Sequence, residues 1–117
     1  YPDFLIASSE WFAFVPAKEY FDEPGDHADE LETSVMMHYH PELVNLDEAG
    51  NGDYKKFTSQ MLNEKVAWIP RNWQKVSQDT GIGNPKKASA GKGKKYAEAV
   101  VAKYALLFEE LVHKELY

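Results

Sequence analysis

Cysteine is absent from this sequence, and so are long hydrophobic runs. Without cysteine, the chain can hold no disulfide bond, no thiolate zinc site and no cysteine nucleophile. The absence of cysteine suits both reducing and oxidising compartments, so it does not indicate which of them holds the protein. Apolar runs such as Trp11 to Val15 have about five residues, far fewer than the ~20 that a membrane helix needs, so we expect no membrane partner. The sequence also starts without methionine or a signal region, and we therefore expect it to be a piece of a longer chain.

What is present is the composition of one globular domain, because 44% of the 117 residues are hydrophobic and 27% are charged. The charge is unevenly distributed along the chain. Residues 1–53 hold 13 acidic side chains and one basic one, whereas residues 54–117 hold 6 acidic and 12 basic ones. An acidic half repels phosphate backbones, and we therefore expect no nucleic-acid partner.

Two short apolar runs, Phe4 to Ser8 and Val66 to Ile69, are typical of buried strands. Between them, apolar residues at helical spacing predict a helix over residues 27–40, with Asp26 as its N-cap and Pro41 at its end. Two such strands cannot form a self-sufficient sheet. We therefore expect an α/β layer protein whose other strands come from elsewhere in the protein.

A second and longer helix is predicted from Lys94 to Leu116. Its apolar positions form one stripe, made of Ala97, Val100, Val101, Tyr104, Leu107, Phe108, Leu111 and Val112. Residues 77–93 precede it and are rich in glycine and lysine, which predicts a loop. The glycines and lysines of this loop do not have the spacing of a P-loop or of a dinucleotide-binding turn.

One histidine and four carboxylates gather at the start of the first predicted helix, within residues 25–34. These carboxylates can simply complement the helix dipole, with His27 exposed to solvent. In the functional alternative, His27 moves a proton near neutral pH. Glu32, beside the apolar stripe of that helix, then binds a divalent metal ion. Composition alone leaves both interpretations open.

The same segment carries a resemblance to a known family. Residues 27–34, His-Ala-Asp-Glu-Leu-Glu-Thr-Ser, resemble the His-Ala-Gly-Glu-x-Glu-Thr-Ser signature of the creatininase (creatinine amidohydrolase) family. Residues 80–85, Thr-Gly-Ile-Gly-Asn-Pro, are similar to the family's Gly-Val-x-Gly-Asp-Pro block, and the long C-terminal helix also matches. Asp29 replaces the signature glycine, and Asn84 replaces the usual aspartate.

The resemblance implies a three-layer α/β/α domain, to which residues 1–117 contribute the C-terminal segment without the metal-binding upstream half. Family members hydrolyse a carbon–nitrogen bond of a cyclic amide or formamide with two divalent metal ions, here expected to be zinc or manganese. His27 matches the catalytic histidine that protonates the leaving nitrogen, and Glu32 matches a metal-ligating glutamate. Asp26 lies where an acidic neighbour of the histidine is common, and we expect it to bind substrate.

We therefore expect a small-molecule amide substrate, a homo-oligomeric assembly and a cytoplasmic location for the intact protein. Enzymes acting on creatinine itself carry a tryptophan shortly before the histidine, where this chain has Tyr20, Phe21 and Glu23, so creatinine is not the expected substrate. The isolated chain is expected to be inactive. The alternative is a non-catalytic α/β segment that serves assembly or binding.

Overall fold

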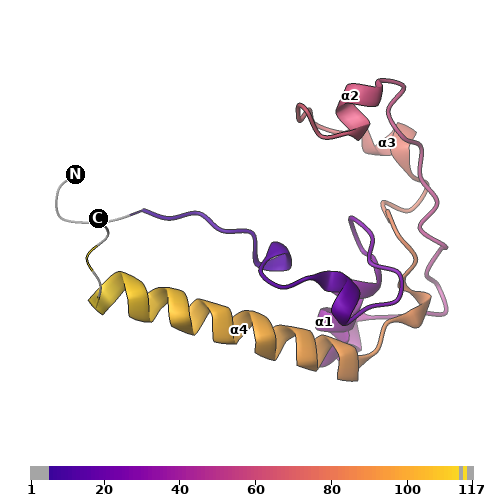
Figure 1. Ribbon diagram of the computed structural model, residues 1–117. Coiled ribbons are helices and arrows are strands. Elements are labelled where there is room, and N and C mark those ends of the chain that lie inside the picture. Colours follow the sequence, from indigo (N-terminus) through magenta and orange to yellow (C-terminus); the bar gives the residue numbers. More distant parts are fainter. Residues whose placement is uncertain (1–5, 114, 116–117) are drawn as a thin grey trace.

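The computed structural model describes residues 6–113 and residue 115. Within them the chain is built from helices joined by long irregular segments (Figure 1). The α-helices are α1 (Glu30–Tyr39), α2 (Gln60–Asn63), α3 (Trp73–Val76) and α4 (Ala90–His113). Short 3-10 helices are η1 (Trp11–Ala13), η2 (Ala17–Glu19), η3 (Pro41–Leu43) and η4 (Pro85–Lys87). No helix of this described part has the length and apolarity needed to cross a membrane.

The core lies between α1 and the first half of α4, which pack against each other (Figure 1). Its buried residues are Phe21, Leu31, Tyr96 and Val100. Tyr96 is at its centre, because this side chain is fully buried and its hydroxyl donates a hydrogen bond to the Phe12 carbonyl at 2.8 Å. The aromatic segment before α1 is thereby fastened to α4.

The close packing of α1 on α4 depends on a glycine. A Cβ atom on Gly93 would lie 1.9 Å from the carbonyl oxygen of Ser34, far inside van der Waals contact. Ser34 is itself fully buried, and its hydroxyl oxygen accepts a hydrogen bond from the backbone N–H of Ser89 at 3.1 Å. The backbone of α4 at Gly93 therefore packs directly against the backbone of α1 at Ser34.

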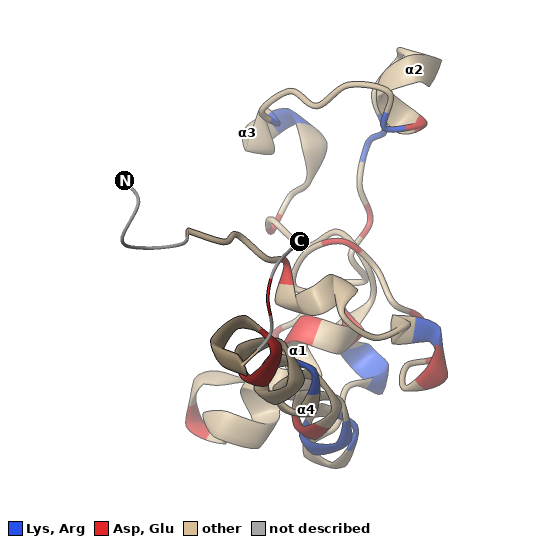
Figure 2. Ribbon diagram, turned by 60° about the vertical axis from the view of Figure 1, so that its left-hand side comes forward, with Lys and Arg blue, Asp and Glu red and all other residues tan. Residues whose placement is uncertain are grey.

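Ion pairs join the acidic first half of the chain to the basic second half, so both signs of charge surround α1 and α4 (Figure 2). The pairs are Asp22 and Glu30 with Lys92, Glu23 with Lys87, and Asp26 with Arg71. The charge asymmetry seen in the sequence thus becomes complementarity between two segments of one fold.

Both predicted helices form, with different boundaries. Pro41 ends the first helix as predicted, but α1 begins at Glu30, and the prediction that Asp26 caps it is wrong. Ala28 has a φ of 48°, which breaks the helical path, and the carboxylate of Asp29 caps the helix by accepting a hydrogen bond from the backbone N–H of Glu32 at 2.9 Å. Asp26 is instead paired with Arg71.

The long helix is confirmed, although it starts four residues earlier than predicted, at Ala90, and its described part ends at His113. Of its apolar stripe, Ala97 and Val100 are buried. Val101, Phe108 and Val112 are exposed. Tyr104 packs against the core, and Leu107 and Leu111 are half-buried. The fully buried part of the stripe is therefore confined to its first half.

The predicted strands do not form among the described residues. Phe4 and Leu5 lie outside them, and Ile6 to Ser8 have no regular structure. Val66 and Ala67 form a bend after Lys65, whose φ is 60°, and Trp68 and Ile69 have no regular structure. A strand needs a neighbour to satisfy its backbone, and this described part holds only two isolated bridges, His27–Ile82 and Tyr54–Ser77.

The contact between Gly93 and Ser34 leads to a stability prediction. Gly93→Ala should lower the free energy of unfolding of the intact protein by about 1–3 kcal/mol, because the new methyl group forces α1 and α4 apart. Gly91→Ala is the matched control on the same helix turn, since a Cβ there meets no atom within 4 Å. It should leave stability unchanged or raise it by up to about 1 kcal/mol. Urea unfolding measures both, and equal stability of the two variants would contradict the packing described here.

Candidate functional site

The two motif blocks of the sequence lie side by side in the structure. His27 and Ile82 form an antiparallel bridge, in which the backbone N–H of each donates to the carbonyl of the other at 3.0 and 2.8 Å. Gly83 has a φ of 119°, and a Cβ on it would lie 2.9 Å from the Cα of Gly25. Residues 80–85 therefore support the loop that leads through His27 into α1.

His27 and Glu32 come together at this junction. Nδ1 of His27 lies 3.3 Å from Oε2 of Glu32, and the same oxygen accepts a hydrogen bond from the backbone N–H of Ala28 at 2.6 Å. The His27 side chain is 46% exposed, and the Glu32 side chain is 36% exposed. A carboxylate at Nδ1 orients the imidazole, which leaves Nε2 as the nitrogen for proton transfer.

Asp26 is held by an ion pair that sequence reasoning missed. The two terminal nitrogens of Arg71 donate to its two carboxylate oxygens at 2.6 and 2.7 Å. These hydrogen bonds lower the pKa of Asp26, although partial burial opposes the shift. The same pairing raises the pKa of Arg71. Asp26 is therefore a carboxylate next to His27, with part of its hydrogen-bonding capacity already used.

A tryptophan also contacts the candidate general acid. The ring centroids of His27 and Trp73 are 5.2 Å apart, with an angle of 52° between the ring planes. Trp73 is 37% exposed, and the guanidinium carbon of Arg71 lies 5.6 Å from the centroid of its ring. Arg71 and Trp73 lie more than forty residues after His27 and belong to no motif, so no sequence pattern predicted this contact.

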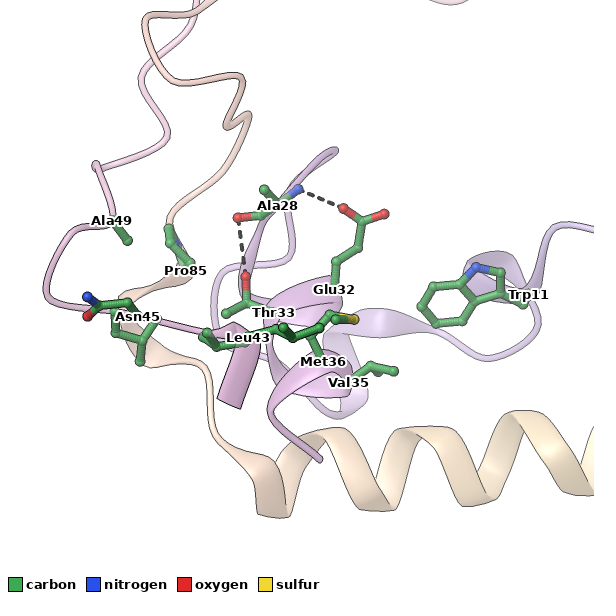
Figure 3. A pocket seen from close by; sticks show the side chains of 12 residues that line it. Trp11, Ala28, Glu32, Thr33, Val35, Met36, Leu43, Asn45, Ala49 and Pro85 are labelled. Atoms are coloured by element: carbon green, nitrogen blue, oxygen red, sulfur yellow. Dashed lines mark hydrogen bonds between the residues drawn. The ribbon is translucent and has the colours of Figure 1, made fainter. Parts of the chain in front are cut away.

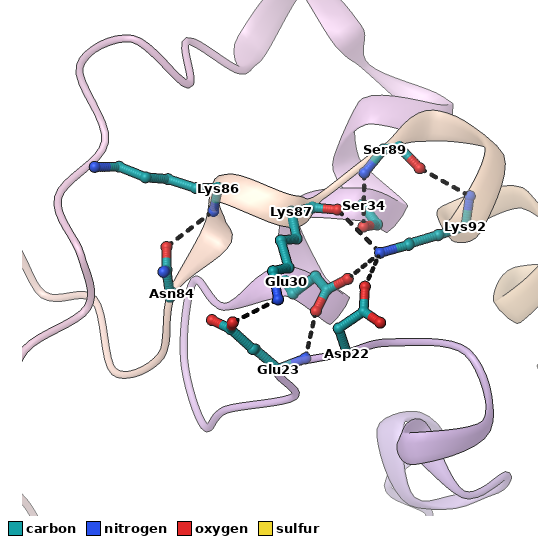
Figure 4. Close-up of polar contacts among 9 residues, drawn as sticks. All are labelled: Asp22, Glu23, Glu30, Ser34, Asn84, Lys86, Lys87, Ser89 and Lys92. Carbon is teal, nitrogen blue, oxygen red and sulfur yellow. Dashed lines mark hydrogen bonds and ion pairs between the residues drawn. The ribbon is translucent and has the colours of Figure 1, made fainter.

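Glu30, the first residue of α1, carries a fully buried carboxylate whose partners are shown in Figure 4. Glu30 accepts a hydrogen bond from the Lys92 ammonium at 2.5 Å and another from the backbone N–H of Glu23 at 2.6 Å. Lys92 also donates to Asp22 at 2.7 Å and to the carbonyl of Lys87 at 3.2 Å. The hydrogen bonds from Lys92 to Asp22 and Glu30 raise the pKa of Lys92 and lower that of Asp22.

The carboxylate of Glu30 therefore has a structural role, because Lys92 and the backbone of Glu23 already occupy it and it is not available to bind a metal ion. Sequence reasoning assigned it only to the helix dipole. One signal was present, because Glu30 and Ser34 are one helical turn apart and both fall on the buried face.

An apolar cavity of about 470 Å³ opens on the side of α1 that carries Glu32 (Figure 3). Glu32 and Thr33 supply polar atoms to its wall. The apolar part of the wall includes Trp11, Val35, Met36, Leu43, Val44, Leu46 and Pro85. A small organic molecule could bind in this open cavity beside a carboxylate.

For a metal ion, the described residues offer one suitable side chain and not a complete site. No group of three or more histidine, aspartate or glutamate side chains in this part of the chain is placed to hold a metal. The carboxylates of Asp26, Asp29 and Glu30 serve an ion pair, a helix cap and a buried pair. Oε1 of Glu32 accepts no hydrogen bond from the described residues, so Glu32 fits one position of a multi-ligand site.

Comparisons with known proteins identify similar sequences. The family model described as creatininase, creatinine amidohydrolase, matches residues 4–108. A crystal structure from Bacteroides fragilis NCTC 9343, named "Putative creatinine amidohydrolase", is similar with 59% sequence identity and a TM-score of 0.90. The similarity covers 100% of this chain and 47% of that one, so this chain spans about half the length of its solved relative. Among curated proteins, none matches.

The Asp26–Arg71 pair predicts an acid-dependent stability difference. Because the pKa of Asp26 is lowered in the folded state, the pair stabilises the fold above the ordinary carboxyl pKa and is lost as pH falls through the lowered value. Asp26→Asn should therefore cost about 0.5–1 kcal/mol at pH 7, the scale of a partly exposed pair, and nothing at strongly acid pH.

Urea unfolding of the intact protein between pH 7 and pH 2 measures this difference. Asp47→Asn is the control, because Asp47 is exposed and no ion pair to its side chain is found among the described residues. Stability curves of Asp26→Asn and the unmodified protein that run parallel over the whole pH range would contradict the prediction.

Proposed function

This chain belongs to the creatininase family, and we propose that the intact protein is a metal-dependent amidohydrolase that cleaves a carbon–nitrogen bond of a small cyclic amide or formamide. One observation carries the proposal: the signature histidine and glutamate meet, with Nδ1 of His27 3.3 Å from Oε2 of Glu32. A histidine paired in this way suits general acid catalysis, and the neighbouring cavity suits a small substrate.

His27 is the proton donor in the proposed reaction. Water adds to the amide carbon, and the carbon–nitrogen bond breaks as the leaving nitrogen takes a proton from Nε2 of His27. The carboxylic acid that forms releases the proton contributed by the water, and this proton recharges His27 through solvent. The carboxylate of Glu32 contacts Nδ1 and keeps the ring oriented during this transfer. Such positioned proton transfer typically contributes a factor of about 10²–10⁴ to the rate.

Glu32 has a second proposed role as a metal ligand through Oε1, the oxygen that accepts no hydrogen bond from the described residues. Two divalent ions, zinc or manganese, would supply a water of lowered pKa and polarise the amide carbonyl. We assign the remaining ligands to an upstream half of the same three-layer α/β/α domain.

Asp26 is proposed to contact the substrate. Each carboxylate oxygen can accept about two hydrogen bonds, and Arg71 uses one on each oxygen, so acceptor capacity remains for an amide N–H. The proposed intact protein is a cytoplasmic homo-oligomer.

In the intact protein, His27→Ala should lower turnover about a hundredfold or more while metal content stays normal, because the proton donor is lost and no ligand is removed. Glu32→Gln should instead lower metal content. Steady-state kinetics on cyclic amides and formamides, together with metal analysis, tests both variants. His40→Ala is the control, since His40 is exposed and pairs only with Glu42 among the described residues. Near-normal turnover of His27→Ala would remove this residue from the mechanism.

The isolated 117-residue chain should neither turn over substrate nor bind zinc or manganese tightly, because one carboxylate cannot replace a multi-ligand site. Calorimetric titration with each metal measures this, with the Glu32→Gln chain as the control for binding elsewhere. Stoichiometric binding tighter than about micromolar that disappears in Glu32→Gln would refute the prediction.

A further inference from the structure

We propose that Trp73 and Arg71 are positioning residues for His27, an inference that rests on the proposed function and extends the site to a segment outside the family signature. Trp73 is the first residue of α3, and its ring lies against the imidazole with 5.2 Å between centroids. The segment that carries α2 and α3 otherwise extends away from α1 and α4 (Figure 1). Its contact with the site is therefore local.

Arg71 connects the loop before His27 to Trp73 through two contacts. Its two terminal nitrogens donate hydrogen bonds at 2.6 and 2.7 Å to the two carboxylate oxygens of Asp26, the residue immediately before His27. Its guanidinium carbon also lies 5.6 Å from the Trp73 ring centroid, in cation–π contact. A bidentate pair defines an orientation as well as a distance, so the position of Trp73 relative to His27 is set through the Arg71 side chain.

His27 needs such a restraint, because its side chain is 46% exposed and its only ion pair among the described residues is with Glu32 at one ring nitrogen. The carboxylate fixes Nδ1, but the ring can still rotate about that contact. The indole of Trp73 limits this rotation and so fixes the direction in which Nε2 points. Misplacing a catalytic group by about 1 Å can cost a hundredfold in rate, and a restraint of this kind acts on turnover.

The test uses the intact enzyme with Trp73→Ala, Trp73→Phe and the control Trp68→Ala. Trp68 lies five residues earlier in the same segment and is 83% exposed. Trp73→Ala should lower kcat about tenfold to a hundredfold while KM and metal content change by less than about twofold. Trp73→Phe restores an aromatic ring and should recover kcat to within about threefold of the unmodified enzyme, whereas Trp68→Ala should have no effect.

A second measurement does not depend on activity. In spectra of the intact protein with isotope-labelled histidine, the indole ring current shifts the His27 ring-proton signals, which are assigned with His27→Ala. Trp73→Ala and Arg71→Gln should both move these signals toward those of exposed histidines, and Trp68→Ala should not. Arg71→Lys keeps the charge but loses the bidentate geometry, so it should also move them.

The proposal is overturned if Trp73→Ala leaves kcat and the His27 signals unchanged, or if Trp68→Ala lowers kcat equally. Absence of amidohydrolase activity in the unmodified intact protein would instead refute the proposed function. In that case the histidine spectra still decide whether Trp73 and Arg71 hold His27.

Discussion

The site and the core both depend on the buried carboxylate of Glu30. A charge removed from water is tolerated only when it is paired and hydrogen-bonded, and Glu30 obtains these partners from Lys92 on α4 and from the backbone of Glu23. One side chain thus ties together the loop before His27, the first turn of α1 and the start of α4. Losing any of these three segments would leave an uncompensated charge in the interior, so they fold as one unit.

Helix geometry connects this buried pair to the chemistry. Glu30 and Glu32 are two residues apart in α1, which separates their directions by about 200°. When Glu30 points into the core, Glu32 must face the cavity and His27. The buried carboxylate and the proposed metal ligand therefore lie within one turn of α1, and the cap formed by Asp29 fixes where that turn begins.

The features predicted correctly from the sequence are those that depend on residues close together in the chain. The apolar stripe predicted the long helix, and the signature predicted the family. The signature marked His27 and Glu32 as site residues, but their 3.3 Å contact appears only in the structure. The assignment of the helix cap to Asp26 failed, because Arg71 competes for this carboxylate from 45 residues away. The contact of Trp73 with His27 was not predicted either, because it also joins positions far apart in the sequence. The strand at Val66 to Ile69 was wrong because strand formation requires a pairing partner, and apolar composition alone does not supply one.

The hydrogen bond from Ser89 to Ser34 joins positions 55 residues apart, and most of the chain between them is irregular. The entropy of closing such a loop rises only with the logarithm of its length, so doubling the loop costs only about 0.6 kcal/mol. Evolution can therefore lengthen or shorten the stretch between Tyr54 and Pro70 almost freely. The anchoring positions at Ser34 and Gly93 have no such freedom, because backbone there meets backbone. We expect related proteins to differ most in the length of the stretch between Tyr54 and Pro70, and least at Ser34 and Gly93.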